Sequence, residues 1–209
     1  MDTTMETCRE FTRLLASDRP TPGGGGGAAL VGAVAAALGG MVTALTVGKP
    51  AYAAVEPELR SLCRTCETLR LTLLELVEAD AEGFAPLAAA YAIPKEEPHR
   101  AEAMESATLQ AVKAPMEILR ACAAVIKAAE RLSEIGAVSV RSDAGCAAVC
   151  ARGAMEAAAL NVFVNTHGLK DRAAARALEE EAEALLEDGI PRAEAVYTAL
   201  IRGYKEGSL

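Results

Sequence analysis

The sequence predicts an all-α protein, folded as a single-domain helical bundle of about seven helices over residues 1–209. Aromatic residues make up only 3% of the chain and tryptophan is absent, although 52% of the residues are hydrophobic. The apolar content is therefore mostly alanine and leucine, which favour helices over strands. No segment has the strict alternation of a strand, and 209 residues correspond to one domain with a sizeable core.

The N-terminal quarter predicts a helix, a loop and a second helix. Residues 1–16 place Phe11 and Leu14 among charged residues at helical spacing. Residues 17–27 contain two prolines, Pro20 and Pro22, and then five consecutive glycines, so we expect a loop there. Residues 28–47 carry no charge and form a stretch long enough to span a membrane. Because this stretch is mostly alanine and glycine, we expect instead a buried helix whose Gly32, Ala36 and Gly40 pack closely on a partner helix.

A long helix is predicted from residue 56, where Pro57 and two glutamates suit a helix N-terminus. Its apolar residues recur at steps of three and four, which marks one buried face: Leu59, Leu62, Cys66, Leu69, Leu73 and Leu76. The next position of that face is Asp80. A carboxylate is thus expected where the pattern requires an apolar side chain, and Pro86 is expected to kink the helix soon afterwards.

The second half of the chain predicts four more helical segments. A loop at residues 93–98 precedes a helix that Pro115 bends or restarts and that Gly136 ends. Ser142 and Asp143 are expected to cap a nearly uncharged helix over residues 144–165. Asp171 is expected to cap a helix that runs to residue 186, and residues 190–191 open a short last one.

Charge and cysteine content exclude several classes of function. A net charge of -8 provides no basic surface for nucleic acid, so we expect no nucleic-acid partner. The six cysteines lie in helical segments and no signal peptide is apparent, which indicates reduced thiols in the cytoplasm. Cys63–Cys66 and Cys146–Cys150 could together bind zinc, but helical spacing without knuckle turns favours small core residues. We therefore predict no metal.

The glycine-rich segment is the first candidate binding element. Thr21, Gly23, Gly24 and Gly25 stand just before an uncharged helix, where free backbone N–H groups and the helix dipole favour an anionic or strongly polar ligand group. A structural turn is the alternative. Five glycines in a row exceed what a turn requires, so we favour a binding role.

Two carboxylates are candidates for proton transfer. Asp80 lies on an apolar face, where burial would raise its pKa toward neutrality, and Asp143 begins a helix rich in small residues. The alternatives are a buried ion pair for Asp80 and simple helix capping for Asp143. Asn161 and Asn165 are four residues apart, so they share a helix face and can present donors and acceptors to a heteroaromatic ligand.

These motifs resemble the cyclodeaminase/cyclohydrolase family, which occurs as the C-terminal domain of formiminotransferase-cyclodeaminase and as free-standing bacterial proteins. The resemblance covers most of the chain, and its carrying segments are Thr21-Pro22-Gly23-Gly24-Gly25, Gly48-Lys49 with Tyr52, Asp80-Ala81-Glu82 with Phe84, Ser142-Asp143-Ala144-Gly145, and Asn161-Val162 with Asn165. It implies an all-helical subunit, a homodimer or larger assembly with its site near the subunit contact, and a tetrahydrofolate derivative as substrate without a further cofactor.

The resemblance also implies roles for individual residues. Asp143 or Asp80 would move the proton and Lys49 would tune the charge. Where this sequence departs from the family pattern, we suggest that Arg141 or Arg152 contacts the acidic tail of the folate; this suggestion is not part of the resemblance. The glycine segment with Thr21, Ser142, Asn161 and Asn165 would hold the pterin and the one-carbon bridge.

Three functions are compatible with these residues. The first is a 5,10-methenyltetrahydrofolate cyclohydrolase, favoured because the sequence shows no formiminotransferase domain. The second is a 5-formiminotetrahydrofolate cyclodeaminase that releases ammonia. The third is a non-catalytic helical binding protein without a membrane partner, in which Asp80 would be an inert buried charge. A buried carboxylate and an oversized glycine segment both cost stability unless they are used, which favours an enzyme.

Overall fold

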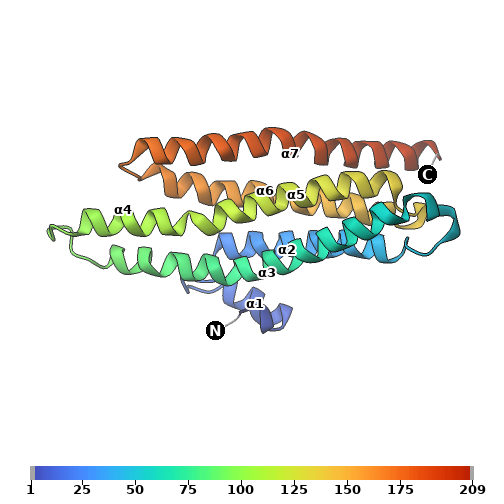
Figure 1. The fold of residues 1–209 in the computed structure, drawn as a ribbon. Coiled ribbons are helices and arrows are strands. Elements are labelled where there is room, and N and C mark those ends of the chain that lie inside the picture. Colours follow the sequence, from blue (N-terminus) through green and yellow to red (C-terminus); the bar gives the residue numbers. More distant parts are fainter. Residues whose placement is uncertain (1–2, 208–209) are drawn as a thin grey trace.

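The alanine-rich chain is helical along almost its whole described length. The computed structural model describes residues 3–207, and it contains seven α-helices, three 3-10 helices and no strand in that range (Figure 1). The all-α prediction is confirmed. Of the predicted first helix, residues 1–2 lie outside the described part. The α-helices are α1 (Cys8–Leu15), α2 (Gly24–Ala44), α3 (Glu56–Tyr91), α4 (Arg100–Ala111), α5 (Lys113–Ile135), α6 (Arg141–His167) and α7 (Arg172–Glu206).

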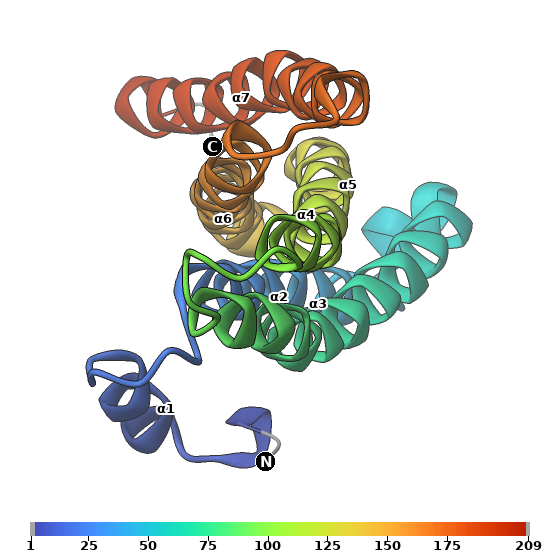
Figure 2. The same cartoon turned by 90° about the vertical axis from the view of Figure 1, so that its left-hand side faces the viewer.

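Helices α2, α5 and α6 pack against one another at the centre of the bundle. Helix α3 covers α2 and α5, while α7 lies against α5 and α6. Figure 2, which looks along the helices, shows α7 at one edge of the bundle and α1 at the opposite edge. The two helices with the lowest proportion of charged residues, α2 and α6, therefore lie in the interior together with α5, and the charged helices α3 and α7 flank them.

Helices α2 and α6 run antiparallel, which gives the bundle two chemically different ends. Gly24, in the first turn of α2, lies beside Asn161 near the end of α6. At the other end, the backbone N–H of Ala137 donates to Thr46 Oγ1 (3.0 Å), just after α2 and just before α6. We call these the glycine end (Gly23–Gly25 and Asn161) and the Thr46 end (Thr46 and Ala137).

Small residues let the central helices approach closely. A Cβ on Gly32 would lie 2.9 Å from Cys122 Sγ and 3.1 Å from Leu73 Cδ2, both in buried side chains. Ala36 is fully buried, whereas a Cβ on Gly40 would meet no atom within 4 Å. The predicted small-residue stripe is thus a packing contact at Gly32 and Ala36 but not at Gly40.

Two segments, Gly24–Ala44 and Val138–His167, are long and apolar enough to cross a membrane by length and composition. Of their most apolar windows, 50% and 44% of the residues are buried inside the bundle. There they pack against each other and against α5. Burial of this kind is a sufficient reason for the absence of charge.

Two predicted helix starts were wrong. Helix α2 begins at Gly24 rather than at residue 28, so four of the five glycines are helical. Helix α6 begins at Arg141, directly after the 3-10 helix Val138–Val140, and Ser142 and Asp143 therefore lie in its first turn instead of capping it. In both places tertiary packing overrides local propensity.

One predicted interruption was also wrong, since α7 continues through Pro191 to Glu206. Pro86, where a kink was predicted, lies inside the continuous helix α3. In α7, Gly189 packs on Met155 and Ile126 next to Pro191, so contacts with α5 and α6 hold the segment in line. Three predicted boundaries were confirmed: Pro115 lies in the first turn of α5, Gly136 caps α5, and Asp171 accepts hydrogen bonds from Ala173 and Ala174 N–H at the start of α7. The helix predicted over residues 1–16 is shorter, because α1 begins at Cys8 after the 3-10 helix Thr3–Met5, and α2 ends at Ala44 rather than at residue 47.

The two environments of glycine in α2 predict opposite effects of the same substitution. Gly32→Ala should lower the free energy of unfolding by about 1–3 kcal/mol, because its methyl group overlaps Cys122 and Leu73. Gly40→Ala should raise it by about 0.5–1 kcal/mol, because alanine favours a helix and the space is open. Urea unfolding of both variants measures the difference, and equal shifts would contradict the packing described for α2.

Candidate functional site

The contact between Asp80 of α3 and the first turn of α2 is the most unusual feature of the glycine end. The backbone N–H of Gly26 donates to Asp80 Oδ2 at 2.9 Å. A Cβ on Gly25 would lie only 2.2 Å from Asp80 Oδ1, so no other residue type fits there without displacing the carboxylate. The glycines thus allow a helix N-terminus to approach a carboxylate at hydrogen-bond distance.

Burial raises the pKa of Asp80 above its ordinary value, and the hydrogen bond from Gly26 opposes that rise. Asp80 forms no ion pair within the described residues, so the predicted alternative of a buried salt bridge is not what the structure shows. A partly desolvated carboxylate without a cationic partner is suited to accepting and returning a proton.

A cavity of about 250 Å³ opens beside this carboxylate. It brings together residues from the glycine segment, α3, the end of α4 and the end of α6. These lining residues are Pro20, Thr21, Gly23, Gly24, Gly25, Asp80, Phe84, Ala111, Asn161, Val164 and Asn165. Seven of the predicted site residues therefore share one pocket, which we call the Asp80 pocket.

The two asparagines have a fixed orientation at the wall of the Asp80 pocket. Asn161 Nδ2 donates to the carbonyl oxygen of Ala157, and Asn165 Nδ2 donates to that of Asn161, both at 2.8 Å. Because a carbonyl can only accept, each amide group turns its Oδ1 away from these bonds. Both oxygens then remain available to accept hydrogen bonds from a ligand.

The first turn of α2 contributes donors to the same pocket. The helix ladder starts with the N–H of Gly27, which donates to Gly23 O at 2.9 Å, and the N–H of Gly26 is used by Asp80. The N–H groups of Gly24 and Gly25 precede that ladder and line the cavity. The pocket therefore offers backbone donors, amide acceptors and one proton-carrying carboxylate.

The other predicted site residues lie at the Thr46 end. Asp143 and Asn161 are 18 residues apart on the continuous helix α6, which separates them by roughly 27 Å at 1.5 Å per residue. Lys49 follows α2 at that same end, where Tyr52 Oη accepts a hydrogen bond from Val138 N–H (3.3 Å). One subunit therefore does not bring Lys49, Ser142 or Asp143 to the Asp80 pocket.

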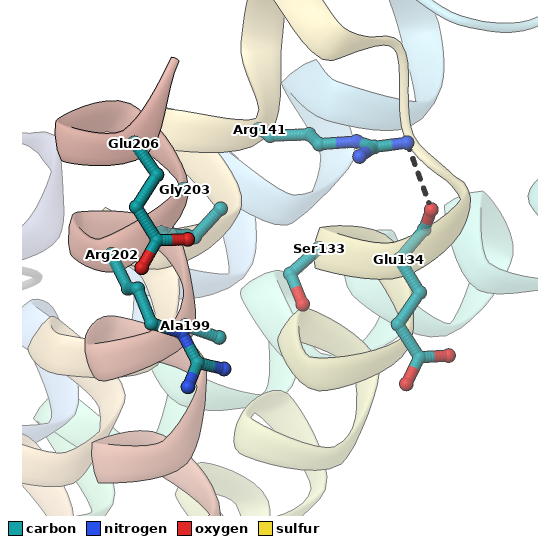
Figure 3. Close-up of a pocket in the computed structure, with 8 residues that line it drawn as sticks. Ser133, Glu134, Arg141, Ala199, Arg202, Gly203 and Glu206 are labelled. Atoms are coloured by element: carbon teal, nitrogen blue, oxygen red, sulfur yellow. Dashed lines mark hydrogen bonds between the residues drawn. The ribbon is translucent and has the colours of Figure 1, made fainter. Parts of the chain in front are cut away.

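Arg141, predicted as a ligand contact, is used within the fold. Its Nε donates to Gly136 O and one terminal nitrogen donates to Glu134 O, each at 3.1 Å (Figure 3). It lines a separate cavity of about 470 Å³ in which Arg202 and Glu206 of α7 face the end of α5. Arg152, the predicted substitute, lies near Glu156 on α6, in a different cavity from Asp80. Neither arginine reaches the Asp80 pocket in one subunit.

The cysteines do not form a cluster. All six thiols are free, and no group of three His, Cys, Asp or Glu side chains in residues 3–207 is arranged to hold a metal ion. Burial raises the pKa of Cys66 to about 11 and that of Cys122 to about 12. These two thiols pack against Gly39 and Gly32 in the core. Of the four cysteines predicted as core residues only Cys66 is buried, since Cys63 and Cys150 are half-buried and Cys146 is exposed.

Some lining residues of the Asp80 pocket had no usable signal in the sequence. Phe84 follows Asp80 by one helical turn and could be expected on its face. Ala111 and Val164 could not, because they reach the pocket only through the packing of α4 and α6 against α3 and α2.

Comparisons with known proteins identify relatives along the whole chain. The family model described as "Formiminotransferase-cyclodeaminase" matches residues 7–184. The "Methenyltetrahydrofolate cyclohydrolase" of Methylorubrum extorquens is 42% identical over 196 residues, which are 92% of this chain and 94% of that protein. The "Formimidoyltransferase-cyclodeaminase" of Sus scrofa is 29% identical over 92% of this chain, which spans only 36% of that longer protein.

A solved structure shares the fold. The crystal structure of a formiminotetrahydrofolate cyclodeaminase from Thermotoga maritima superposes with a TM-score of 0.84 at 29% identity. The match covers 95% of this chain and 98% of the other. The helical arrangement that forms the Asp80 pocket is therefore shared in outline by a protein of the same length class.

The raised pKa of Asp80 predicts a stability cost that depends on pH. A carboxyl group whose pKa is higher in the folded than in the unfolded state destabilises the fold above its folded pKa, and this cost disappears as the pH falls below the unfolded value. Asp80→Asn should therefore raise the urea midpoint at pH 7, and the gain should shrink as the pH approaches 4. Equal or lower stability of the variant at pH 7 would contradict the described environment.

Proposed function

The chain belongs to the formiminotransferase-cyclodeaminase family, and from this premise we propose that it is a 5,10-methenyltetrahydrofolate cyclohydrolase. The proposal rests on the relative named methenyltetrahydrofolate cyclohydrolase, which is 42% identical to this chain. The match covers 92% of this chain and 94% of that protein. The Asp80 pocket supplies groups that this reaction requires: a proton carrier, donors and acceptors.

The reaction needs only water addition and proton transfer. Asp80, when ionised, would accept a proton from a water molecule while the oxygen of that water forms a bond to the methenyl carbon of the cationic substrate. The resulting tetrahedral carbon then loses its bond to N5, which takes a proton from Asp80, while the hydroxyl proton leaves to solvent. The carbon remains on N10 as a formyl group, one water has been consumed and one proton has been released.

The pocket can orient the substrate for this attack. The pterin ring carries N–H donors, which the Oδ1 atoms of Asn161 and Asn165 can accept. The N–H groups of Gly24 and Gly25 can donate to its carbonyl oxygen, and Phe84 provides an apolar wall. Because every step is a proton or water transfer, the proposal includes no metal or redox cofactor, and the free thiols fit a cytoplasmic enzyme.

A second candidate function is the cyclodeaminase reaction, which the name of the Thermotoga maritima structure favours. In that reaction N10 of 5-formiminotetrahydrofolate attacks the formimino carbon and ammonia leaves. The product is the methenyl compound that the first reaction consumes, so both reactions use the same bridge and the same proton carrier. The two can therefore be distinguished only by substrate.

Absorbance of the methenyl chromophore distinguishes the candidate functions. A cyclohydrolase makes the absorbance of 5,10-methenyltetrahydrofolate disappear faster than in buffer alone. A cyclodeaminase makes it appear from 5-formiminotetrahydrofolate, with release of ammonia. If neither signal changes at high protein concentration, the chain is a binding protein and the proposal fails.

The position of the two carboxylates predicts unequal effects on turnover. Asp80→Asn should lower kcat by about 10²–10⁴-fold and remove the rise of the rate with pH that reports an ionising base. Asp143→Asn keeps a polar side chain in the first turn of α6 and should leave turnover within a few-fold. Steady-state kinetics from pH 5 to pH 9 measures both. A large loss in Asp143→Asn would mean that a second subunit delivers Asp143 to the site.

We also propose that the protein is a homodimer. Helix α2 exposes Val31, Val34, Met41 and Leu45 at steps that follow a helical stripe, on the side opposite its buried residues. Helix α6 exposes Leu160 and Val164, each more than 70% accessible. Apolar stripes of this length on adjacent helices are typical of a surface that a second chain covers.

The exposed stripe predicts the size of the particle in solution. Light scattering at micromolar concentration should give twice the 21.6 kDa of one chain. Val34→Glu should shift the particle toward one chain, because it places a charge in the covered surface. A wild-type protein of 21.6 kDa under these conditions would contradict the dimer.

A further inference from the structure

A second cavity continues the Asp80 pocket toward the turn between α3 and α4. Its volume is about 330 Å³, and it shares Val164 and Asn165 with the Asp80 pocket. The two cavities therefore adjoin at these residues. We call the second cavity the tail groove, and the two cavities together the groove. The tail groove is lined by Leu87, Tyr91, Arg100, Ala101, Met104, Glu105, Thr108, Val164, Asn165, Gly168 and Lys170.

The lining residues follow helical stripes that start in the Asp80 pocket. On α3 the lining positions are 80, 84, 87 and 91, and on α4 they include 111, 108, 104 and 100, with 101 and 105 beside them. Such steps of three and four place each set on one helix face. Eleven residues of helix correspond to roughly 16 Å. The groove thus runs for about that length from Asp80 to Tyr91 and Arg100.

The middle of the groove is apolar. Leu87 is buried at its base, and Met104 is half-buried on the facing helix. Tyr91 is exposed at its rim, with 58% of its surface accessible, and Val164 lies where the rim meets the proposed dimer surface. A flat ring lying between Met104 and Tyr91 would cover apolar surface that the subunit otherwise leaves in water.

The outer end of the groove carries two cations. Arg100 Nε donates to Ile93 O at 2.8 Å, which holds the guanidinium in place and leaves its terminal nitrogens to donate elsewhere. Lys170 lies in the turn between α6 and α7. Within residues 3–207 neither side chain forms an ion pair at 4.0 Å or less, although the protein as a whole is acidic.

One carboxylate, Glu105, also lines this end, but its oxygens are engaged. It accepts hydrogen bonds from the backbone N–H groups of Asp171 and Lys170, all at 2.9 Å. These bonds lower the pKa of Glu105, and the nearby Lys170 charge lowers it further. Glu105 therefore fixes the α6–α7 turn that carries Lys170, rather than closing the groove to an anion.

The chemical groups along the groove occur in the same order as the groups of a folate that they would bind. Polar amides and a carboxylate come first, an apolar section follows, and two cations come last. A tetrahydrofolate consists in the same order of a pterin with its one-carbon bridge, a p-aminobenzoyl ring and a glutamate with two carboxylates. Resting on the proposed function, we propose that Arg100 and Lys170 bind the glutamate carboxylates of the substrate and make the enzyme selective for glutamate-bearing folates.

Removing either the glutamate or the cations should have matching effects. For the wild type, KM should be about 10-fold or more higher for 5,10-methenyltetrahydropteroate, which lacks the glutamate, than for 5,10-methenyltetrahydrofolate. Arg100→Ala and Lys170→Ala should each raise KM for the folate about 10-fold with kcat within twofold. Neither should change KM for the pteroate. Lys113→Ala, an exposed lysine that lines neither cavity, is the matched control and should change nothing.

Binding of a fragment separates this inference from the proposed function. In isothermal titration, p-aminobenzoyl-L-glutamate should bind the wild type more tightly than p-aminobenzoate, and the difference should disappear in Lys170→Ala. This result without any turnover would retain the tail groove and reject the reaction. If the enzyme turns over but the ratio of KM for folate to KM for pteroate is the same in the wild type and in both variants, Arg100 and Lys170 do not bind the glutamate. That result would reject the inference and retain the reaction. Lys170 makes no side-chain hydrogen bond in the described chain, so the test remains valid even if Arg100→Ala unfolds.

Discussion

The close approach of a helix N-terminus to the half-buried carboxylate of Asp80 is the constraint on which the rest of the structure depends. Asp80 lies so near the first turn of α2 that only glycine fits at position 25. The same turn must also pass beside Asn161 of α6. Three helices can converge at one point only if one of them has almost no side chains there. The glycines of α2 are thus required by the site and by the packing together.

The fold class could be predicted because it depends on composition and periodicity, which are local properties. Low aromatic content favours helices over strands. The apolar stripe from Leu59 to Leu76 and the caps at Gly136 and Asp171 each depend on residues of a single helix. Predictions failed where another helix decides the outcome. Five glycines favour a loop by propensity, but contacts with α3 and α6 hold four of them in a helix. Pro191 is retained inside α7 for the same reason, since Gly189 packs on Met155.

The candidate site was predictable only in part. Asp80 was identifiable as a polar exception on an apolar stripe, and Asn161 with Asn165 as a polar pair on an apolar helix. Their placement next to Gly24 and Gly25 confirms that these residues share a pocket. Asp143 was identifiable as a carboxylate at a helix start and Lys49 only through the family resemblance, yet the antiparallel packing of α2 and α6 places both at the Thr46 end. Sequence order cannot show at which end of a bundle a residue lies when both ends carry polar groups.

The central claim is that the carboxylate that shapes the glycine end is also the proton carrier. The most direct test is a ¹³C NMR titration of the Asp80 carboxyl carbon in the free protein, compared with the pH dependence of kcat/KM for 5,10-methenyltetrahydrofolate. The account predicts that Asp80 titrates above the ordinary range of aspartate and that its pKa coincides with the acidic limb of the rate profile. A titration in the ordinary range, or a rate profile whose limb does not coincide with it, would contradict the account.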